Sequence, residues 1–410
     1  MRVKTASAAA AAAFALLLSG CYLALGSGGG MAKVSINVIH SGAKALKAIP
    51  TNVASVALVV TAAGMAPITA TAPVSAGSIT VSVPAGPART FTLMLNTPSA
   101  TLEGVATTDL QAGQSTAINV TPTLAATQLV IPDYGNSRLV QISDMSGTGW
   151  VTKTYADFAG FGSADLEPYD IDFDSRGRIY VANSYSTVAG LFRIDDIMHT
   201  TPTMIDSSSG SGITTVAVDR TKDRIYYVNP SISSTTLLWK DADNLSNSGS
   251  YDITAADSEA VSIQGMAADN QGILYLLVYE ATPLQVFFYD VLRYVPGGGV
   301  LGRSQANVLT SPRAIMVKDP YVYVSDVGSN TIARFDNSSL SFMGSFGGPS
   351  TDPFVGPSYF VAPFDRPLTV IDDIYLFKRV TSFNDFSGTG WTTFGSNGSG
   401  LDQFLFWNLG

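Results

Sequence analysis

Cysteine, histidine and charge are all scarce in this 410-residue chain. Its one cysteine, Cys21, excludes an intrachain disulfide. Its two histidines, His40 and His199, are too few for a histidine-rich metal centre or for catalysis that needs several histidines. Only 13% of the residues are charged, and a net charge of −9 argues against a nucleic-acid surface, because phosphate binding needs clustered Lys and Arg. The 46% hydrophobic content and the 38 glycines favour an all-β protein rich in turns.

The first 21 residues have the pattern of a secretory signal. Arg2 and Lys4 precede an unbroken apolar run over 8–18, which is too short for a comfortable transmembrane span. The following string LSGC at 18–21 resembles the lipobox of bacterial lipoproteins. The resemblance implies that residues 1–20 are a signal peptide and that Cys21 carries the lipid. An uncleaved signal anchor over 6–26 is the alternative.

The residue after the cysteine bears on the destination of such a lipoprotein. In lipoproteins of this kind an Asp at that position tends to retain the protein at the inner membrane, whereas this chain has Tyr22. The resemblance therefore implies a bacterial envelope protein held at the membrane through lipid on Cys21, at the outer membrane rather than the inner one. Its several acyl chains would provide stable anchoring.

Residues 21–124 predict a linker followed by a small domain. The string SGGG at 27–30 is typical of a flexible linker over 21–32. Over 33–124, β-branched or alternating runs recur about every ten residues between Pro and Gly, which predicts a β-sandwich. The stretch resembles immunoglobulin-like and carboxypeptidase-regulatory-like spacer domains of bacterial envelope proteins, which implies a spacer. The expected strands cover 34–39, 55–61, 78–83, 90–95, 105–109 and 115–120.

Residues 125–410 contain an internal repeat of strand, polar turn and strand. The plainest copy is DIDFDSRGRIYVAN at 170–183, and four strands per period of 45–50 residues predict a β-propeller blade. Weaker copies lie at 216–229, 266–279, 314–326 and 361–372, with turn aspartates Asp174, Asp219, Asp269, Asp319 and Asp365. A third strand is expected after each copy, at 191–195, 237–241, 286–290, 332–336 and 374–378.

The string SGTGW occurs at 146–150 and again at 387–391, about five blade lengths later. We expect it to form the turn into the outer strand of the first and last blades; chance reuse of a glycine turn is the alternative. Residues 129–155 are expected to form the second, third and fourth strands of a blade whose first strand is missing. Phe404–Leu409 is expected to form one strand more than the last blade needs. The sequence therefore predicts six blades, closed by a C-terminal strand that removes an exposed sheet edge.

Four strings in 125–410 resemble NHL-repeat propellers: YGNSRLVQI at 134–142, DSRGRIYVAN at 174–183, GSNTIARFD at 328–336 and FGSNGSGLDQF at 394–404. The sixth blade departs most, since FDRPLTVIDD replaces the glycine turn. The resemblance implies a disc that binds other molecules, often proteins, on one face. Related six-bladed propellers include metal-dependent lactonases and lyases, so a hydrolase or lyase in the channel is the alternative function.

Three aspartates offer a metal-ligand pattern. Asp170, Asp172 and Asp174 alternate along one strand and would share a face, which could hold calcium. A polar strand end followed by a turn aspartate is the favoured interpretation, because no twelve-residue calcium loop is present. The loop acids Glu167 and Glu259 do not complete a lactonase set at matching blade positions. We expect no catalytic residues and no cofactor, with calcium as the alternative.

The loops that join second to third strands are expected to share one face with the loops that lead into each blade. Loops on a rigid scaffold commonly carry binding, and Tyr and Asn are good interface residues, although Asn and Asp also serve turn geometry. The leading hypothesis is a non-catalytic binding or scaffolding platform for a protein or glycan. Its candidate binding residues are Asp133, Tyr134, Asn136, Asn183, Tyr185, Asn229, Glu280, Asp326 and Asn330.

Overall fold

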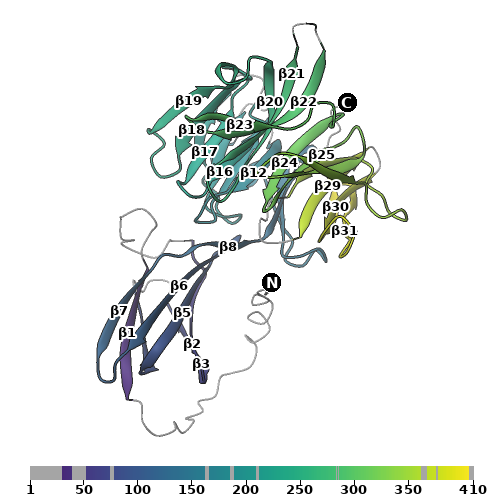
Figure 1. Cartoon of the computed structure of the whole chain (residues 1–410). Helices are drawn as coiled ribbons and strands as arrows, with labels where there is room; N and C mark the ends of the chain where they lie inside the picture. The colour runs from purple at the N-terminus through teal and green to yellow at the C-terminus, as the bar shows by residue number, and fades with distance from the viewer. Residues whose placement is uncertain are drawn as a thin grey trace.

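The computed structural model shows two all-β units, a small sandwich and a larger set of radiating sheets (Figure 1). In the part of the chain that is described, no helix is both long and apolar enough to span a bilayer. Cys21, His40, Tyr185, Asp365 and residues 406–410 lie outside the described residues. The structure describes residues 30–38, 52–73, 78–161, 166–184, 189–208, 212–282, 284, 286–361, 367–374 and 377–405.

The sandwich consists of two sheets, with strand orders β4-β1-β7 and β3-β2-β5-β6-β8. Alternate residues of the first strand, such as Val34 and Ile36, are fully buried between the sheets. Each of the six expected strands overlaps an observed one. The strand at 65–72 was not expected. It contains Pro67 and lies at the edge of its sheet, where a proline is tolerated. The strands are β1 (Met31–Val38), β2 (Ser55–Ala62), β3 (Met65–Ala72), β4 (Ser78–Pro84), β5 (Gly86–Asn96), β6 (Ala100–Leu110), β7 (Ser115–Val120) and β8 (Thr123–Thr127).

The larger unit has, among the described residues, one three-stranded and five four-stranded antiparallel sheets, arranged as the blades of a β-propeller. The first blade is β9 (Leu129–Asp133), β10 (Arg138–Ile142) and β11 (Val151–Thr154). The second is β12 (Pro168–Phe173), β13 (Ile179–Asn183), β14 (Gly190–Ile194) and β15 (Thr203–Ser207). The third is β16 (Val216–Asp219), β17 (Arg224–Val228), β18 (Thr236–Asp241) and β19 (Ser248–Asp252).

The remaining blades continue the same order. The fourth is β20 (Ala260–Ala268), β21 (Leu274–Ala281), β22 (Phe287–Val295) and β23 (Gly299–Arg303). The fifth is β24 (Pro312–Lys318), β25 (Tyr321–Asp326), β26 (Thr331–Asp336) and β27 (Phe342–Phe346). The sixth is β28 (Pro357–Phe360), β29 (Leu368–Ile374), β30 (Phe377–Phe383) and β31 (Thr392–Phe394), followed by the short pair β32 (Ser396–Asn397) and β33 (Gln403–Phe404). The first strands of successive blades lie next to one another around the centre.

Three of the five expected turn aspartates, Asp174, Asp219 and Asp269, accept from the backbone that follows them. Asp319 instead accepts from the Asn337 amide at 2.7 Å, and Asp365 lies outside the described residues. The Asp174 carboxylate accepts hydrogen bonds from the backbone N–H groups of Arg176 and Arg178, both at 3.0 Å. Asp269 accepts in the same way from Gln271 at 2.8 Å and Ile273 at 2.9 Å. An aspartate that bonds its own following backbone is a common turn former. The period of the sequence therefore reflects a repeated local structure.

Both SGTGW strings form the same turn into the last strand of a blade, from β10 to β11 in the first blade and from β30 to β31 in the sixth. Asp144 accepts a hydrogen bond from the Ser146 backbone N–H at 2.8 Å, and Asp385 accepts one from Ser387 at 2.8 Å. The glycines of both turns have positive φ, between 72° and 81°, which glycine adopts without steric cost. The expectation for this string is confirmed.

The sixth blade differs from its expected limits. Its first two strands were expected within 361–372 and its third at 374–378, whereas they cover 357–360, 368–374 and 377–383. The expected third strand IYLFK therefore spans a connection between two strands. Asp373 and Lys378 face each other across that hairpin as a buried ion pair, so these two residues belong to separate strands.

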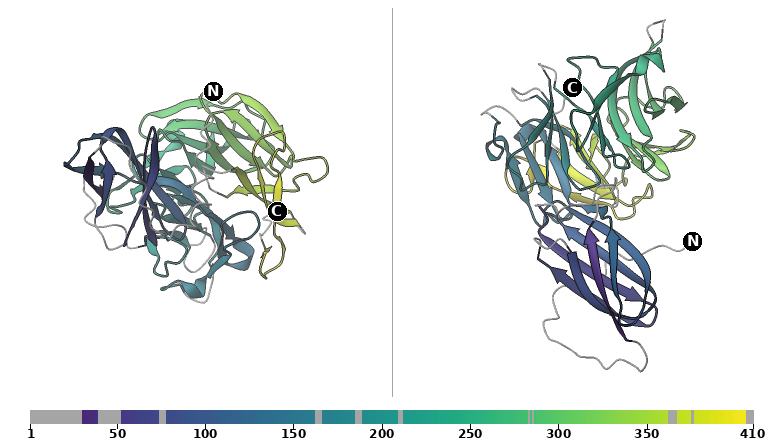
Figure 2. Two further views of the ribbon diagram at one scale, coloured as in Figure 1. Left: turned by 90° about the horizontal axis from the view of Figure 1, so that it is seen from below. Right: turned by 90° about the vertical axis from the view of Figure 1, so that its left-hand side faces the viewer.

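The sandwich packs on one side of the first two blades. The Leu124 backbone N–H donates to the Ser175 carbonyl at 2.8 Å, and the Ile197 N–H donates to the Ser99 hydroxyl at 2.8 Å. Ser175 and Ile197 lie in turns that follow first and third strands. We call the face with these turns the sandwich face, and the opposite face, with the loops after second strands and before first strands, the far face. Seen from below, the sandwich lies to one side of the blades (Figure 2).

Candidate functional site

A repeated hydrogen bond holds the loops of the far face. At the end of a second strand, a buried carboxylate or amide oxygen accepts from the backbone N–H of the residue that leads into the first strand of the same blade. We call this contact the latch. It satisfies a buried polar group and a loop N–H together, which fixes where the first strand begins. The latch pairs are Glu167–Asn183 at 2.7 Å, Ser311–Asp326 at 2.8 Å and Gly356–Asp372 at 2.7 Å, and Leu405–Asp133 at 2.9 Å matches them.

Other candidate binding residues also contact the protein's own chain. Tyr134 donates its hydroxyl to Glu167 at 3.2 Å, and Asn136 donates its amide to Asp133 at 2.9 Å. Buried Asn229 donates to Asp206 at 3.2 Å. The described candidates are distributed around the far face, in the first five blades. Asp133, Tyr134 and Asn136 lie together in the first blade, and Asp326 and Asn330 share the β25–β26 turn of the fifth.

The last two candidates lie in different settings. Asn330 is exposed in the loop after β25 and has a left-handed φ of 55°. Glu280 is fully buried beside Asp257 and Asp290, and all three carboxylates form ion pairs with Arg303. Burial raises the pKa of Glu280 to about 8 and that of Asp290 to about 6, although Arg303 opposes both shifts. One guanidinium therefore forms ion pairs with three carboxylates, which come from β21, from β22 and from the loop before β20.

The three aspartates of the calcium hypothesis are used differently. Asp170 accepts from the Val216 backbone N–H at 2.9 Å, and Asp172 accepts from Val218 at 2.8 Å. Alternate residues of β12 thus bond alternate residues of β16, and this joins two neighbouring blades along the channel. Asp174 lies in its turn and does not share their contacts. Within the described ranges, no group of three or more His, Cys, Asp or Glu residues is placed to hold a metal ion.

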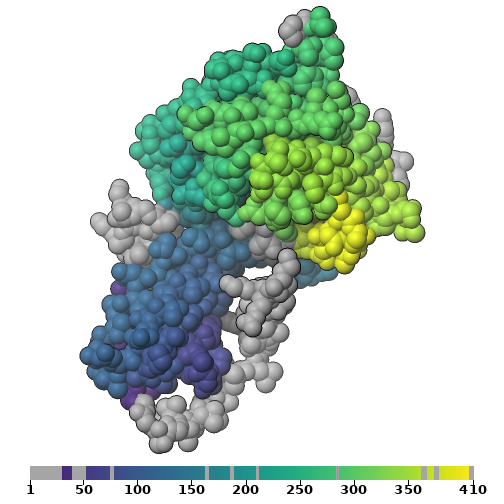
Figure 3. Space-filling model, viewed as in Figure 1, coloured from purple at the N-terminus to yellow at the C-terminus, as the bar shows by residue number. Residues whose placement is uncertain are grey.

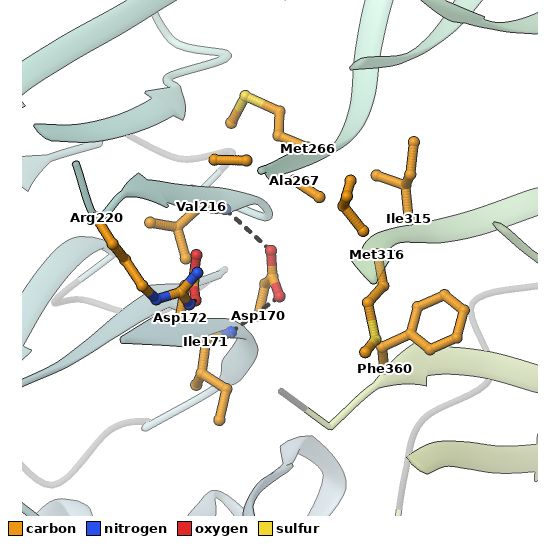
Figure 4. Close-up of a pocket in the computed structure, with 12 residues that line it drawn as sticks. Asp170, Ile171, Asp172, Val216, Arg220, Met266, Ala267, Ile315, Met316 and Phe360 are labelled. Atoms are coloured by element: carbon orange, nitrogen blue, oxygen red, sulfur yellow. Dashed lines mark hydrogen bonds and ion pairs between the residues drawn. The ribbon is translucent and has the colours of Figure 1, made fainter. Parts of the chain in front are cut away.

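The channel between the first strands contains connected cavities. A deep cavity of about 70 Å³ has Asp170, Asp172 and Arg220 on one side and Met316 and Phe360 on another (Figure 4). Burial raises the pKa of Asp170 to about 7. Arg220 forms an ion pair with Asp172. The deep part of the channel is therefore a packed mixture of apolar groups and satisfied carboxylates.

A wider cavity of about 240 Å³ opens at the far face, and we call it the channel mouth. Two of its residues, Tyr169 and Arg313, directly follow Pro168 and Pro312, and the strand register shifts at both positions. Such a bulge re-aims a side chain, here toward the mouth. The lining residues are Tyr169, Thr214, Gln264, Tyr289, Ser311, Pro312, Arg313 and Tyr359.

These lining residues were not among the candidates expected from the sequence, which were Asp, Asn, Tyr and Glu residues in loops. Most of the lining residues lie in or just before first strands, whereas Tyr289 lies in the third strand β22. A signal was nevertheless present, because EPY at 167–169 and SPR at 311–313 share a proline and differ at the next residue. When the residue at a position changes between copies of a repeat, the structure common to the copies does not require one particular residue type there.

The far face also carries an apolar projection. Leu284 is 87% exposed, and Val286 and Phe287 are 53% and 51% exposed. The ring of Phe287 stacks on Tyr279 with centroids 5.5 Å apart. These residues lie at or near the tip of the long β21–β22 hairpin, which stands above the blades at the end of the molecule away from the sandwich (Figure 3). We call Tyr279, Leu284, Val286 and Phe287 the hairpin patch.

Comparisons with known proteins show distant similarity to solved structures. No protein-family model matches the sequence, and no curated protein matches it. A chain of a nidogen/laminin complex is 12% identical with a TM-score of 0.47, over 65% of this chain and 92% of that one. Hydrazine synthase of Kuenenia stuttgartiensis is 13% identical (TM-score 0.43, 74% and 91%). The Cps50 (Swd1) β-propeller domain of Myceliophteria thermophila is 10% identical (TM-score 0.35, 56% and 72%).

Proposed function

We propose that this chain is a bacterial envelope lipoprotein whose propeller is a non-catalytic binding platform for a protein or glycan. The observation that carries the platform is the difference between the two faces. The sandwich, which follows the proposed lipid anchor in the chain, packs on one face. The opposite face carries both the channel mouth and the hairpin patch, whose Leu284 is 87% exposed. Exposed apolar side chains grouped on a monomer are typical of interaction sites.

We further propose that the ring is a closed, six-bladed, NHL-like propeller. Leu405 donates its backbone N–H to Asp133 as Ser311 does to Asp326 in the fifth blade. The residues that follow Ser311 form the first strand of their blade. By analogy, the residues that follow Leu405 would form the missing first strand of the first blade, which supports closure by the C-terminal residues. Phe404, fully buried against β9 and β10, supports the same arrangement.

The non-catalytic part of the proposal is supported by how the channel acids are used. A hydrolase or lyase in the channel would need carboxylates directed at a substrate or an ion. Asp170 and Asp172 instead accept backbone hydrogen bonds from the neighbouring blade. Glu280, Asp257 and Asp290 form ion pairs with Arg303. A binding role therefore fits these contacts better than a hydrolytic one.

The platform can be tested by site-specific photo-crosslinking in cells of the source organism. A photoreactive amino acid would replace Leu284 on the far face or Val105 on β6 of the sandwich, which is 56% exposed and serves as the matched control. We expect a discrete cross-linked partner from position 284 and none from position 105. Cross-links from position 105 alone would contradict the proposal.

The lipid anchor has a separate test. The variant Cys21→Ala should lose acyl labelling and should leave the membrane fraction, because no other cysteine can take the lipid. Unchanged labelling of the variant would refute the anchor. This result does not decide the binding platform, since that proposal is tested by the cross-links formed at position 284.

A further inference from the structure

We propose that the channel mouth binds a sugar ring with a single carboxylate, such as a uronic acid unit of a glycan. The inference rests on the proposed binding function and names the chemical class of its ligand. It depends on the shape of the cavity, on the side chains that line it, and on the charge of the surrounding protein.

The shape of the mouth suits one small ring. Its volume of about 240 Å³ has room for a small organic group rather than for a single ordered water. The rings of Tyr169 and Tyr359 lie 5.0 Å apart at 77°, so they present two aromatic surfaces at nearly a right angle. Tyr289 lines the cavity from the fourth blade. Tyrosine combines a large apolar surface with a polar hydroxyl, which suits the C–H face and the hydroxyl groups of a sugar.

Every polar side chain of the mouth can donate a hydrogen bond, and its hydroxyl and amide groups can also accept one. Among the described residues that line it, Arg313 is the one that carries a charge. A guanidinium matches a carboxylate with two parallel hydrogen bonds, which a hydroxyl cannot reproduce. Gln264 and Thr214 add an amide and a hydroxyl on neighbouring blades, where ring hydroxyl groups would lie. The set fits a polyol with one carboxylate better than an apolar group.

The charge of the whole chain limits the ligand further. The net charge is −9, so a polyanion would be repelled as it approaches the molecule. Asp170 lines the next layer of the channel together with Arg313 and adds a carboxylate below the mouth. Its two oxygens accept from the backbone N–H groups of Val216 and Ile171, each at 2.9 Å. One carboxylate on the ligand is therefore favoured over several.

A peptide is less suited to the mouth than a sugar. A peptide carboxyl terminus would engage Arg313, but it would also bring backbone N–H and C=O groups that need partners. The neighbouring backbone donors of Thr310 and Ser311 are already bonded to Asp326. Side-chain hydroxyl and amide groups remain at the mouth, and these match ring hydroxyl groups.

The test is calorimetric titration of the detergent-solubilised full chain with galacturonic acid, which carries one carboxylate. The comparison ligands are its methyl ester, which lacks the charge, and a dipeptide with a free carboxyl terminus. We expect the uronate to bind at least about tenfold more tightly than the ester or the dipeptide. Equal binding of uronate and ester would overturn the inference, and so would tighter binding of the dipeptide.

Two variants make the result specific to the mouth. Arg313→Gln should weaken uronate binding about tenfold or more, whereas Arg334→Gln should not change it, because Arg334 lies over the rings of Tyr321 and Phe386 outside the mouth. A thermal melt checks that both variants are folded. Unchanged uronate affinity of the folded Arg313→Gln protein would refute the site. If position 284 still cross-links to a partner while uronates do not bind, this inference fails and the proposed platform stands.

Discussion

Removal of one latch side chain should destabilise the propeller measurably. Asp326 is 1% exposed, and its carboxylate accepts from the backbone N–H groups of Thr310 at 2.9 Å and Ser311 at 2.8 Å. A hydrogen bond to a charged group contributes roughly 1.5–3 kcal/mol. Two such bonds at the lower value give about 3 kcal/mol. Because Thr310 can regain a water at its exposed position, we take the lower value for Asp326→Ala.

The design of the experiment separates the latch from the charge. Asp326→Asn keeps one acceptor oxygen, and Asn183 already serves as a latch in the second blade, so this variant should lose about half as much stability, about 1.5 kcal/mol. The control is Asp336→Ala. Asp336 accepts from Ser338 at 3.0 Å and Ser339 at 2.9 Å, but in a turn where water can replace it.

The assay is urea unfolding followed by tryptophan fluorescence, with the midpoint and the slope fitted separately. We expect the order of stability to be wild type, then Asp326→Asn, then Asp326→Ala, with Asp336→Ala close to wild type. A loss below about 1 kcal/mol for Asp326→Ala, or an equal loss for Asp336→Ala, would refute the reasoning. The first result would mean that loop amides on the far face find water as readily as they find the latch.

Three further predictions concern other parts of the propeller. Burial raises the folded-state pKa of Glu280 from 4.5 to about 8, so ionisation of Glu280 lowers the free energy of unfolding as pH rises from 4.5 to 8. In urea titrations, Glu280→Gln should therefore have a free energy of unfolding about 1–2 kcal/mol above wild type at pH 8.5 and equal to wild type at pH 4. Gly135→Ala would place a Cβ 2.0 Å from the Leu405 carbonyl oxygen and should lower Tm by several degrees, whereas Gly302→Ala, with open space around its Cβ, should not. Trp391→Ala removes an indole packed against three phenylalanine rings at 4.9–6.0 Å and should cost about 3 kcal/mol by urea unfolding.

Much of the fold could be predicted because the same strand, turn and strand pattern recurs in the sequence at a regular spacing. The turn aspartates, exemplified by Asp174 and Asp269, bond the backbone that follows them, and this geometry leaves a mark at a regular spacing. The SGTGW string was recognisable for the same reason, since its glycines need positive φ. The sixth blade was misread where an apolar run continued through a connection. Periodicity alone could not divide that run, because the pairing of Asp373 with Lys378 depends on the neighbouring strand.

The candidate site could be predicted only in part, since loop residue types have two uses. Asp133, Asn183 and Asp326 are residue types typical of a binding loop, yet each accepts a hydrogen bond from the backbone of the protein's own chain. The residue type alone does not show whether such a side chain binds a ligand or holds a loop of its own chain. Burial of the side chain does show this, and burial at the end of a second strand depends on how the neighbouring blades pack against it.

A repeat protein offers a way to tell the two uses apart without homologues. Where equivalent positions have the same kind of side chain in several blades, as at the latch, we infer that the residue stabilises the blade structure. Where they differ, the blade does not require any one of them. The residue at the shifted register after the first-strand proline is Tyr169 in the second blade, Arg313 in the fifth and Ser358 in the sixth, and the first two line the channel mouth. An aromatic ring and a guanidinium cannot replace each other in packing, so a shared structural role does not explain them. Their placement around one cavity therefore supports the proposal that the ligand site is the channel mouth rather than the latch residues.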